Sequence, residues 1–506
     1  MPAKRLSPAL LSAALALAPS LARAEPSCVR PSPTSGPDDA PACASSARRG
    51  VEAALATPDA PAARELRASA GRAAMEAFDA FCKQPAAAGA ATRIPDCDAL
   101  AFDAARAFQG AGRSALVIVA ARAVVEHEQR TGTPSPLAPK ASFEVARAYD
   151  GLAAYELAAE WYERVAQRYP AAPEGEAAAK SLVVLRLGLG ETDRAVAAAA
   201  AYVKAYGRTQ PSTAAAVALA IGASHEERGD HAAALRHLSQ SMATIERGPI
   251  DLRVRAHATL ARVIAATDGP KSARAAAEYA SVLALVPEPS KVPRAIADAW
   301  PGEDEPRHDR RLAHVLTAQG EALFFAAEAR RVAEVAPLSP PVARAGLDAA
   351  ALSAWAAKEL RPWMIKRQRA IELVEQDFVK ILDIQPVPPP RWVVAAAAVV
   401  GAMWGDLADD LRKKALVGAL PRDPALRREY ESTVQSAADP IVRQRALPAM
   451  KKCVDLAAKL MIVDERVKTC EAWLVENDEA HFRRGGEIAP RLRAGARPEQ
   501  GAPLVP

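Results

Sequence analysis

The segment from 141 to 173, ASFEVARAYDGLAAYELAAEWYERVAQRYPAAP, constrains the fold more than any other part of this chain. Its apolar residues form two stripes with helical spacing, one through Tyr149 and one through Tyr162, and Pro170 ends the second stripe. Two helices this short cannot each bury an apolar face alone, so they must pack on each other and on further pairs. The segment therefore predicts one unit of a stacked array of antiparallel helix pairs.

The same pattern recurs on both sides of this segment, and the copies together cover about residues 98–288. Two helices of a pair can approach closely only where a small side chain stands at their crossing, because the side chains at the contact set the distance between the axes. The residues at this position, at successive spacings of 41, 37, 39 and 41, are Val117, Ala158, Ala195, Ala234 and Ala275. A repeat of this length is typical of a helical repeat protein.

The unit at 141–173 resembles a tetratricopeptide repeat and aligns with that family's consensus without gaps. Val145 and Ala146 stand at the Leu-Gly pair, and Ser142 departs from the consensus tryptophan. The spacing of 37 to 41 residues also exceeds the family period of about 34. The remaining matches are Tyr149, Ala158, Tyr162 and Pro170.

Composition agrees with an all-α fold, because alanine is the strongest helix former and aromatic residues are only 5% of the chain. We expect an α-solenoid of tetratricopeptide-like repeats followed by an irregular helical lobe. The expected division is a signal peptide at 1–24, a flexible leader at 25–48, the repeats at 49–288, a linker rich in proline and charge at 289–308, the C-terminal lobe at 309–483 and a flexible tail at 484–506.

The first 24 residues have the pattern of an export signal. Lys4 and Arg5 precede an apolar run, and Ala22-Arg23-Ala24 supplies the small residues of a cleavage site. Cleavage there would remove three of the cations behind the formal charge of +5 and no acid, leaving a nearly neutral chain. We therefore expect an exported protein, periplasmic or associated with the outer membrane, and the charge gives no argument for binding nucleic acid.

The cysteines fit an exported chain, because an even number in an oxidising compartment favours disulfides. None of them has the C-x-x-C spacing of a zinc or redox site. Taken in order they form three local couples, and we expect these couples to pair, although other pairings and free buried thiols remain open. The couples are Cys28 with Cys43, Cys82 with Cys97, and Cys453 with Cys470.

No catalytic, metal-binding or cofactor-binding pattern stands out, so we expect no enzyme activity and no cofactor. His225 and His231 are six residues apart, which places them on different helix faces rather than at the spacing of a zinc motif. His127 and Glu128 are interpreted as an exposed helix end. An acidic pair in a cleft stays an open alternative.

The resemblance implies a binding groove, because in this family the first helix of each repeat lines a concave surface. The positions that match are Arg106, Gln109, Phe143, Arg147, Asp150, Lys180, Glu226 and Glu227. The basic residues among them favour an acidic partner segment, and the glutamates a basic one. A solvated face without a ligand is the alternative for each residue.

The second half of the chain is expected to be helical but irregular. Its PPRWVVAAAAVVGAMW segment and the helices after it are similar to envelope repeat proteins of delta-proteobacteria. The uncharged run at 392–405 is too short for a membrane span, so no transmembrane segment is expected. The tryptophans at 355–404 are predicted to build a second core.

These features favour an interaction scaffold whose partners are other envelope proteins, bound as a peptide or helix in the groove. The alternative is an envelope protein that binds or processes peptidoglycan or another carbohydrate, for which the tryptophans would have to be exposed.

Overall fold

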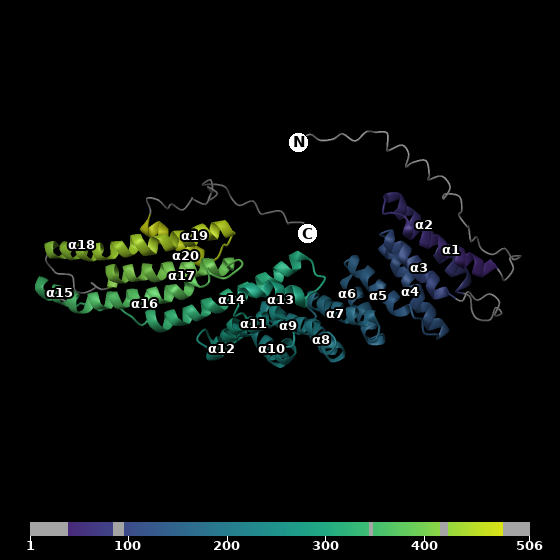
Figure 1. Ribbon diagram of the computed structural model, residues 1–506, viewed down its shortest axis with the longest axis horizontal. Coiled ribbons are helices and arrows are strands. Elements are labelled where there is room, and N and C mark those ends of the chain that lie inside the picture. Colours follow the sequence, from purple (N-terminus) through teal and green to yellow (C-terminus); the bar gives the residue numbers. More distant parts are fainter. Residues whose placement is uncertain (1–38, 84–95, 344–347, 415–423, 479–506) are drawn as a thin grey trace, which may run out of the picture. The chain divides into compact units, whose positions relative to one another are not determined.

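The computed structural model describes residues 39–83, 96–343, 348–414 and 424–478, and these residues contain helices and no strand. The chain divides into two compact units, 1–221 and 222–506 (Figure 1). The predicted all-α fold is confirmed. The helices that begin in the first unit are α1 (Asp39–Ala56), α2 (Pro61–Phe81), α3 (Cys97–Gly110), α4 (Ser114–Thr131), α5 (Ala138–Gly151), α6 (Tyr155–Arg168), α7 (Pro173–Gly188), α8 (Thr192–Tyr206) and α9 (Pro211–Glu227).

The first unit is an array of helical hairpins. Each helix from α2 to α8 packs against the helix before it. In addition, α1 contacts α3 and α5 contacts α7. The first helices of successive pairs therefore lie along one side of the array. This arrangement confirms the helix-turn-helix repeats.

Four turns of the described chain contain the same type of backbone hydrogen bond, which closes the end of the first helix in each pair. In each turn a residue with positive φ precedes an N–H that donates to the carbonyl five residues back, as in a Schellman cap. The donor and acceptor pairs are Arg113 with Phe108, Ala154 with Tyr149, Glu191 with Arg186 and Asp230 with His225, at 2.9 to 3.0 Å. The residues with positive φ are Gly112, Ala153, Gly190 and Gly229.

The alanines predicted at the helix crossings are buried, as close packing of two helices requires. The alanines predicted there, Ala158, Ala195, Ala234 and Ala275, are each 0% exposed. Gly222 on α9 shows how little room remains, since a Cβ added to it would lie 2.3 Å from Leu238 Cδ2.

The second unit begins with three more hairpin helices, at 231–245, 250–268 and 273–285, and then changes character. From α14 onward its helices are longer and several pass into π-helical segments, at 331–335, 356–360, 410–414 and 442–446. Its helices are α10 (His231–Ile245), α11 (Ile250–Asp268), α12 (Ala273–Leu285), α13 (Val292–Ala299), α14 (Glu305–Arg330), α15 (Ala349–Trp355), α16 (Arg361–Val379), α17 (Pro390–Asp409), α18 (Pro424–Ile441), α19 (Leu447–Leu460) and α20 (Glu465–Asn477).

Helix α17 is the central element of the C-terminal lobe and contacts α14, α16, α18, α19 and α20. Glycines allow its close contacts: a Cβ at Gly401 would lie 2.9 Å from Met450 Sδ, and one at Gly405 would lie 2.8 Å from Trp473 Nε1. Trp404 is 2% exposed, and its Nε1 donates to Glu375 Oε2 at 3.1 Å. Trp392 and Trp363 pack against the same core, so the predicted second core is present.

The stretch Pro390–Lys414 is the one helical stretch of the described residues that is long and apolar enough, by length and composition, to cross a membrane. In its most apolar window 67% of the residues are buried against other helices. A core helix of this length passes the same test.

The structure differs from the expected division in two segments. Helix α1 begins at Asp39, inside the expected leader, and Val51 on its apolar stripe is fully buried. The expected linker at 289–308 contains α13, whose Val292 and Ile296 are 2% and 1% exposed in a core shared with α11 and α14. In the described part of each segment a few correctly spaced apolar residues are buried, Ala44 and Ala47 in α1 and Val292 and Ile296 in α13. The boundary between units also falls at 221/222 rather than in this linker.

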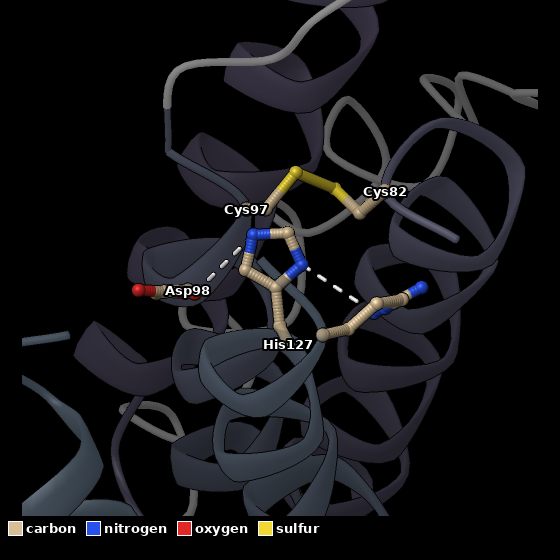
Figure 2. Close-up of a disulfide and its surroundings, with 5 residues drawn as sticks. Cys82, Cys97, Asp98 and His127 are labelled. Carbon is tan, nitrogen blue, oxygen red and sulfur yellow. Dashed lines mark hydrogen bonds and ion pairs between the residues drawn. A yellow bond between two sulfur atoms is a disulfide. The ribbon is translucent and has the colours of Figure 1, made fainter. Parts of the chain in front are cut away.

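Two of the three expected cysteine couples lie at disulfide distance. Cys82 and Cys97 have Cα atoms 5.8 Å apart, and Cys453 and Cys470 have Cα atoms 6.5 Å apart. Cys28 is outside the described residues, so its pairing with Cys43 stays a prediction. The first disulfide joins the end of α2 to the start of α3 (Figure 2).

His127 lies beside this disulfide, and the interpretation of His127 and Glu128 as an exposed helix end is wrong. The His127 ring points one nitrogen toward Asp98, with 3.7 Å from Nε2 to Oδ1 (Figure 2), and stacks edge-on against Phe78. Burial lowers the pKa of His127, an effect that Asp98 opposes. Glu128 is 7% exposed and accepts a hydrogen bond from Arg168. Both side chains therefore join neighbouring helices rather than facing solvent.

Candidate partner-binding face

Six of the residues expected to line a groove lie on first helices of the array. Arg106 and Gln109 are on α3, Phe143, Arg147 and Asp150 are on α5, and Lys180 is on α7. The other two, Glu226 and Glu227, lie at the end of α9 in the second unit.

Two chains of polar contacts connect these first helices. In one, Arg48 of α1 donates from Nε to Asp103 Oδ2 at 2.9 Å, and Arg106 lies 3.4 Å from the other carboxylate oxygen. In the second, Gln109 donates to Glu144 Oε2 at 2.9 Å across from α3 to α5. Arg147 Nη1 donates to Glu144 Oε1 at 3.0 Å. Side chains of α1, α3 and α5 therefore form a polar surface, and together with the exposed Lys180 and Val184 of α7 we call it the first-helix face.

Sequence reasoning missed the two carboxylates on which this face depends. Asp103 and Arg106 are three residues apart, as are Glu144 and Arg147, and the second pair follows the first by 41 residues. This is the spacing of the crossing residues, so a search for charged pairs at the repeat period would have found them. At this spacing on a helix the two side chains are neighbours.

The carboxylates lie beneath the arginines. The side chains of Asp103 and Glu144 are 10% and 15% exposed, while those of Arg106 and Arg147 are 50% and 51% exposed. The cations of this face are therefore exposed, and the carboxylates beneath them orient them. Guanidinium groups held in this way suit carboxylate ligands, which they can bind with two parallel hydrogen bonds.

A cavity of about 210 Å³ opens between α3 and α5 on this face. Lys140 lies over the ring of Phe102, 5.6 Å from its centroid, and adds another cation to the rim. The lining residues are Phe102, Ala105, Arg106, Gln109, Val117, Lys140 and Glu144.

Phe143, the aromatic residue among those expected to line the groove, packs partly inside its own hairpin. Its ring meets that of Tyr162 edge to face, with centroids 5.5 Å apart, and burial raises the pKa of Tyr162 to about 12. Lys180 on α7 is exposed, and Val184 one turn later is 61% exposed. The face therefore ends on α7 with an apolar side chain next to a cation.

The expectation that Glu226 is open to a ligand is wrong. Its carboxylate is held by Arg262, with 3.0 Å from Nη2 to Oε2, and its side chain is 17% exposed. Arg262 also donates to Glu321, which accepts from the Tyr279 hydroxyl at 2.8 Å. Burial raises the pKa of Glu321. Glu227 is exposed, as expected.

The described residues contain no group of three or more His, Cys, Asp or Glu side chains that could hold a metal ion. The first-helix face offers ion pairs and a cavity of about 210 Å³.

No protein-family model matches this sequence, and no curated protein matches it. Among solved structures, Rap protein complexed with competence and sporulation factor has 10% identity and a TM-score of 0.22, over 83% of this chain and 100% of that one. The human IFIT1 dimer with m7Gppp-AAAA has 12% identity and a TM-score of 0.19, over 86% of this chain and 94% of that one. Naa15/Naa10 bound to HypK has 14% identity and a TM-score of 0.21, over 87% of this chain and 73% of that one.

These neighbours are helical repeat proteins. TM-scores this low describe no shared arrangement of the helices, so the matches carry no argument about what this chain binds. The repeat architecture rests on the chain's own turns and crossings.

Proposed function

We propose that this chain is an exported interaction scaffold of the cell envelope and that its first-helix face binds an acidic segment of a partner protein. The site is the surface around Arg106, Arg147 and Lys180. The partner segment would be a peptide or a helix that carries carboxylates and one apolar side chain.

One observation carries this proposal: half-exposed arginines stand at the same position of two successive repeats, each paired with a carboxylate beneath it that is only 10% or 15% exposed. Ordering a free arginine on binding costs side-chain entropy, and a fixed one has already lost it. Val184 and the cavity beside Phe102 supply apolar surface on the same side of α7 and α3.

The test is a quantitative pull-down with the mature chain as bait and crosslinked envelope extract as source. Arg147→Glu combined with Lys180→Glu reverses two exposed charges, breaks the pair of Arg147 with Glu144 and leaves the pair of Arg106 with Asp103 intact. We expect at least a tenfold loss of the specifically captured partner, because like charges then face its carboxylates.

The matched control reverses Arg122 on α4 and Lys204 on α8, which are exposed cations on second helices. This variant should capture the partner as the wild type does. Circular dichroism must show unchanged helix content for both variants. A partner list that is the same for the wild type and Arg147→Glu/Lys180→Glu would remove the proposed face.

Export is supported by the two disulfide-distance pairs, because such pairs are typical of oxidising compartments. Cell fractionation of the full chain and of a chain without residues 1–24 tests it. Equal recovery of both forms in the cytoplasm would contradict export.

No observation favours the carbohydrate alternative. Binding of glycans needs exposed aromatic rings, whereas Trp404 and Trp355 are 2% and 9% exposed and Trp392 packs on Phe324 with centroids 5.1 Å apart.

A further inference from the structure

A second cavity, of about 500 Å³, lies in the second unit and plays no part in the proposed partner binding. It is bounded on one side by the turn between α11 and α12 and on the other by the end of α14 and the π segment at 331–335. Pockets that hold small molecules have volumes of roughly 300–1,000 Å³. The size is therefore that of a ligand site rather than a packing defect.

The long wall of this cavity is apolar. Phe325, Ala329, Val332 and Ala333 follow one another at the spacing of a single helix stripe, and Ala276 faces them from α12. The alanines leave the space that larger side chains would fill. The wall continues into a π segment, and such segments are frequent at functional sites.

The floor of the cavity is held in place by the buried network described above. The Phe325 ring packs on Tyr279 with centroids 4.5 Å apart, and the Tyr279 hydroxyl donates to Glu321. The Phe325 ring therefore packs on a tyrosine that is itself fixed by a hydrogen bond, and it leaves the cavity volume open.

At the mouth of the cavity, among the described residues, the carboxylates have ion-pair partners, whereas one lysine does not. Glu328 accepts two hydrogen bonds from Arg331, at 2.8 and 2.7 Å, so its charge is neutralised. Asp268 in the neighbouring turn pairs with Arg274 at 2.8 Å. Lys271 is exposed at the rim, and within the described part of the chain no carboxylate pairs with it.

We propose that this cavity binds a single-chain carboxylate amphiphile, a medium-chain fatty acid, with its hydrocarbon along the Phe325–Val332 wall and its carboxylate at Lys271. A hydrocarbon chain has no polar groups to satisfy, which matches a wall of alkyl and aromatic surface. A peptide in the same place would lay backbone N–H and C=O groups against that wall without partners, which is costly.

The experiment is isothermal titration of the purified, delipidated full chain with decanoate, and separately with decanol, both below micelle-forming concentrations. Decanoate should bind at least tenfold more tightly than decanol. Lys271→Glu should remove this difference and leave decanol binding unchanged. Lys366→Glu, a charge reversal at an exposed lysine of α16, is the matched control and should change neither affinity.

Ala329→Phe fills the cavity and should abolish binding of both ligands, while Ala326→Phe on the exposed side of α14 should not. If Ala329→Phe fails to fold, photolabelling of the wild type with a diazirine analogue of decanoate replaces it, and the label should fall within 270–276 or 325–333. The proposal is overturned if the wild type binds no decanoate, if decanoate and decanol bind equally, or if the label falls elsewhere. Pull-down results on the first-helix face leave this outcome unaffected.

Discussion

The hairpin array at 97–206 and the lobe at 305–478 reach a helical fold by different means. In the array, the first helix of each hairpin ends at a turn with positive φ, where an N–H donates to the carbonyl five residues back, and this pattern recurs from pair to pair. In the lobe, helices continue past prolines: the π segment at 356–360 precedes Pro362, and the one at 442–446 lies between Pro440 and Pro448. A π turn shifts the hydrogen-bonding register, which accommodates a residue without an N–H.

The difference shows which residues determine the fold of each region. A single residue in each turn specifies a hairpin, so the array is encoded locally. The lobe depends on contacts between residues far apart in sequence. Arg367 on α16 pairs with Asp410 on the π segment after α17, at 2.6 Å, and both side chains are less than a tenth exposed. The predictions below test this contrast.

The largest effect is expected for Arg367→Leu in the lobe. It removes the buried cation beside Asp410 and leaves, among the described residues, only the exposed Lys414, at 2.6 Å, as an ion-pair partner, which should lower the free energy of unfolding by about 3–5 kcal/mol. Arg186→Leu in the array removes an equally buried arginine, but its partners Glu163 and Glu191 are 36% and 32% exposed and keep much of their hydration. Its cost should be nearer 1–3 kcal/mol. Urea unfolding followed by hydrogen exchange of peptides from each region measures both.

Exposed Arg443→Leu is the control for this pair and should stay within about 0.5 kcal/mol of the wild type. Equal losses for Arg367→Leu and Arg186→Leu would show that the lobe does not depend on its buried pair more than the array does.

Removing either disulfide should cost about 3 kcal/mol, because the two closed loops, of 15 and 17 residues, restrict the unfolded chain similarly. Cys82→Ala/Cys97→Ala should increase exchange in α2 and α3, and Cys453→Ala/Cys470→Ala in α19 and α20. Wild type treated with reductant is the control. If removal of one disulfide increased hydrogen exchange in the helices joined by the other disulfide, the array and the lobe would not be stabilised independently.

A pH effect is expected in the second unit, where His257 of α11 joins its neighbouring helices. Its Nδ1 is 2.6 Å from Glu278 of α12, and its Nε2 is 2.7 Å from Glu246, the residue after α10. The bond to Glu278, with that to Glu246, raises the pKa of His257 above its usual value near 6.5, against burial. Both bonds need a charged imidazole, since both nitrogens must donate.

Because the folded pKa is raised, this stabilisation is complete below about pH 6.5 and is lost as the pH rises through the folded value. The melting temperature should therefore fall more between pH 6 and pH 9 for the wild type than for His257→Gln. His308→Gln, a histidine bonded to the Trp300 carbonyl, is the control. Parallel pH curves for wild type and His257→Gln would show that His257 is neutral in the folded chain.

The smallest effect is a gain. Ala153 has φ of 57° where the equivalent turns have glycine at Gly112, Gly190 and Gly229. A left-handed alanine costs roughly 1–2 kcal/mol, partly offset by the freedom that glycine adds to the unfolded chain. Ala153→Gly should therefore stabilise the array by about 0.5–1 kcal/mol, and Gly190→Ala should destabilise it by a similar amount. A lower melting temperature for Ala153→Gly would mean that the alanine methyl makes a contact worth more than the strain.

Much of the array could be predicted, because its signals are local. Glycines at the turns and alanines at the crossings recur at the same spacing, and two cysteine couples bracket single turns. The candidate face was predicted only in part: Arg106 and Arg147 were identified, but the acids that hold them were not. Glu226 was predicted to line the groove because a sequence does not show that Arg262, 36 residues later, pairs with its carboxylate.

The sequence by itself determined that this chain is helical, where its hairpins turn and which neighbouring cysteines can meet. Those outcomes depend on residues that are close in sequence, within one hairpin. Only the tertiary structure decided which charges are buried, where α13 packs, how the lobe carries helices past its prolines, and that the alanines of α12 and α14 leave a cavity beside Lys271. Those outcomes depend on the packing of helices that are distant in the chain, and burial and electrostatic pairing exist only once that packing is complete.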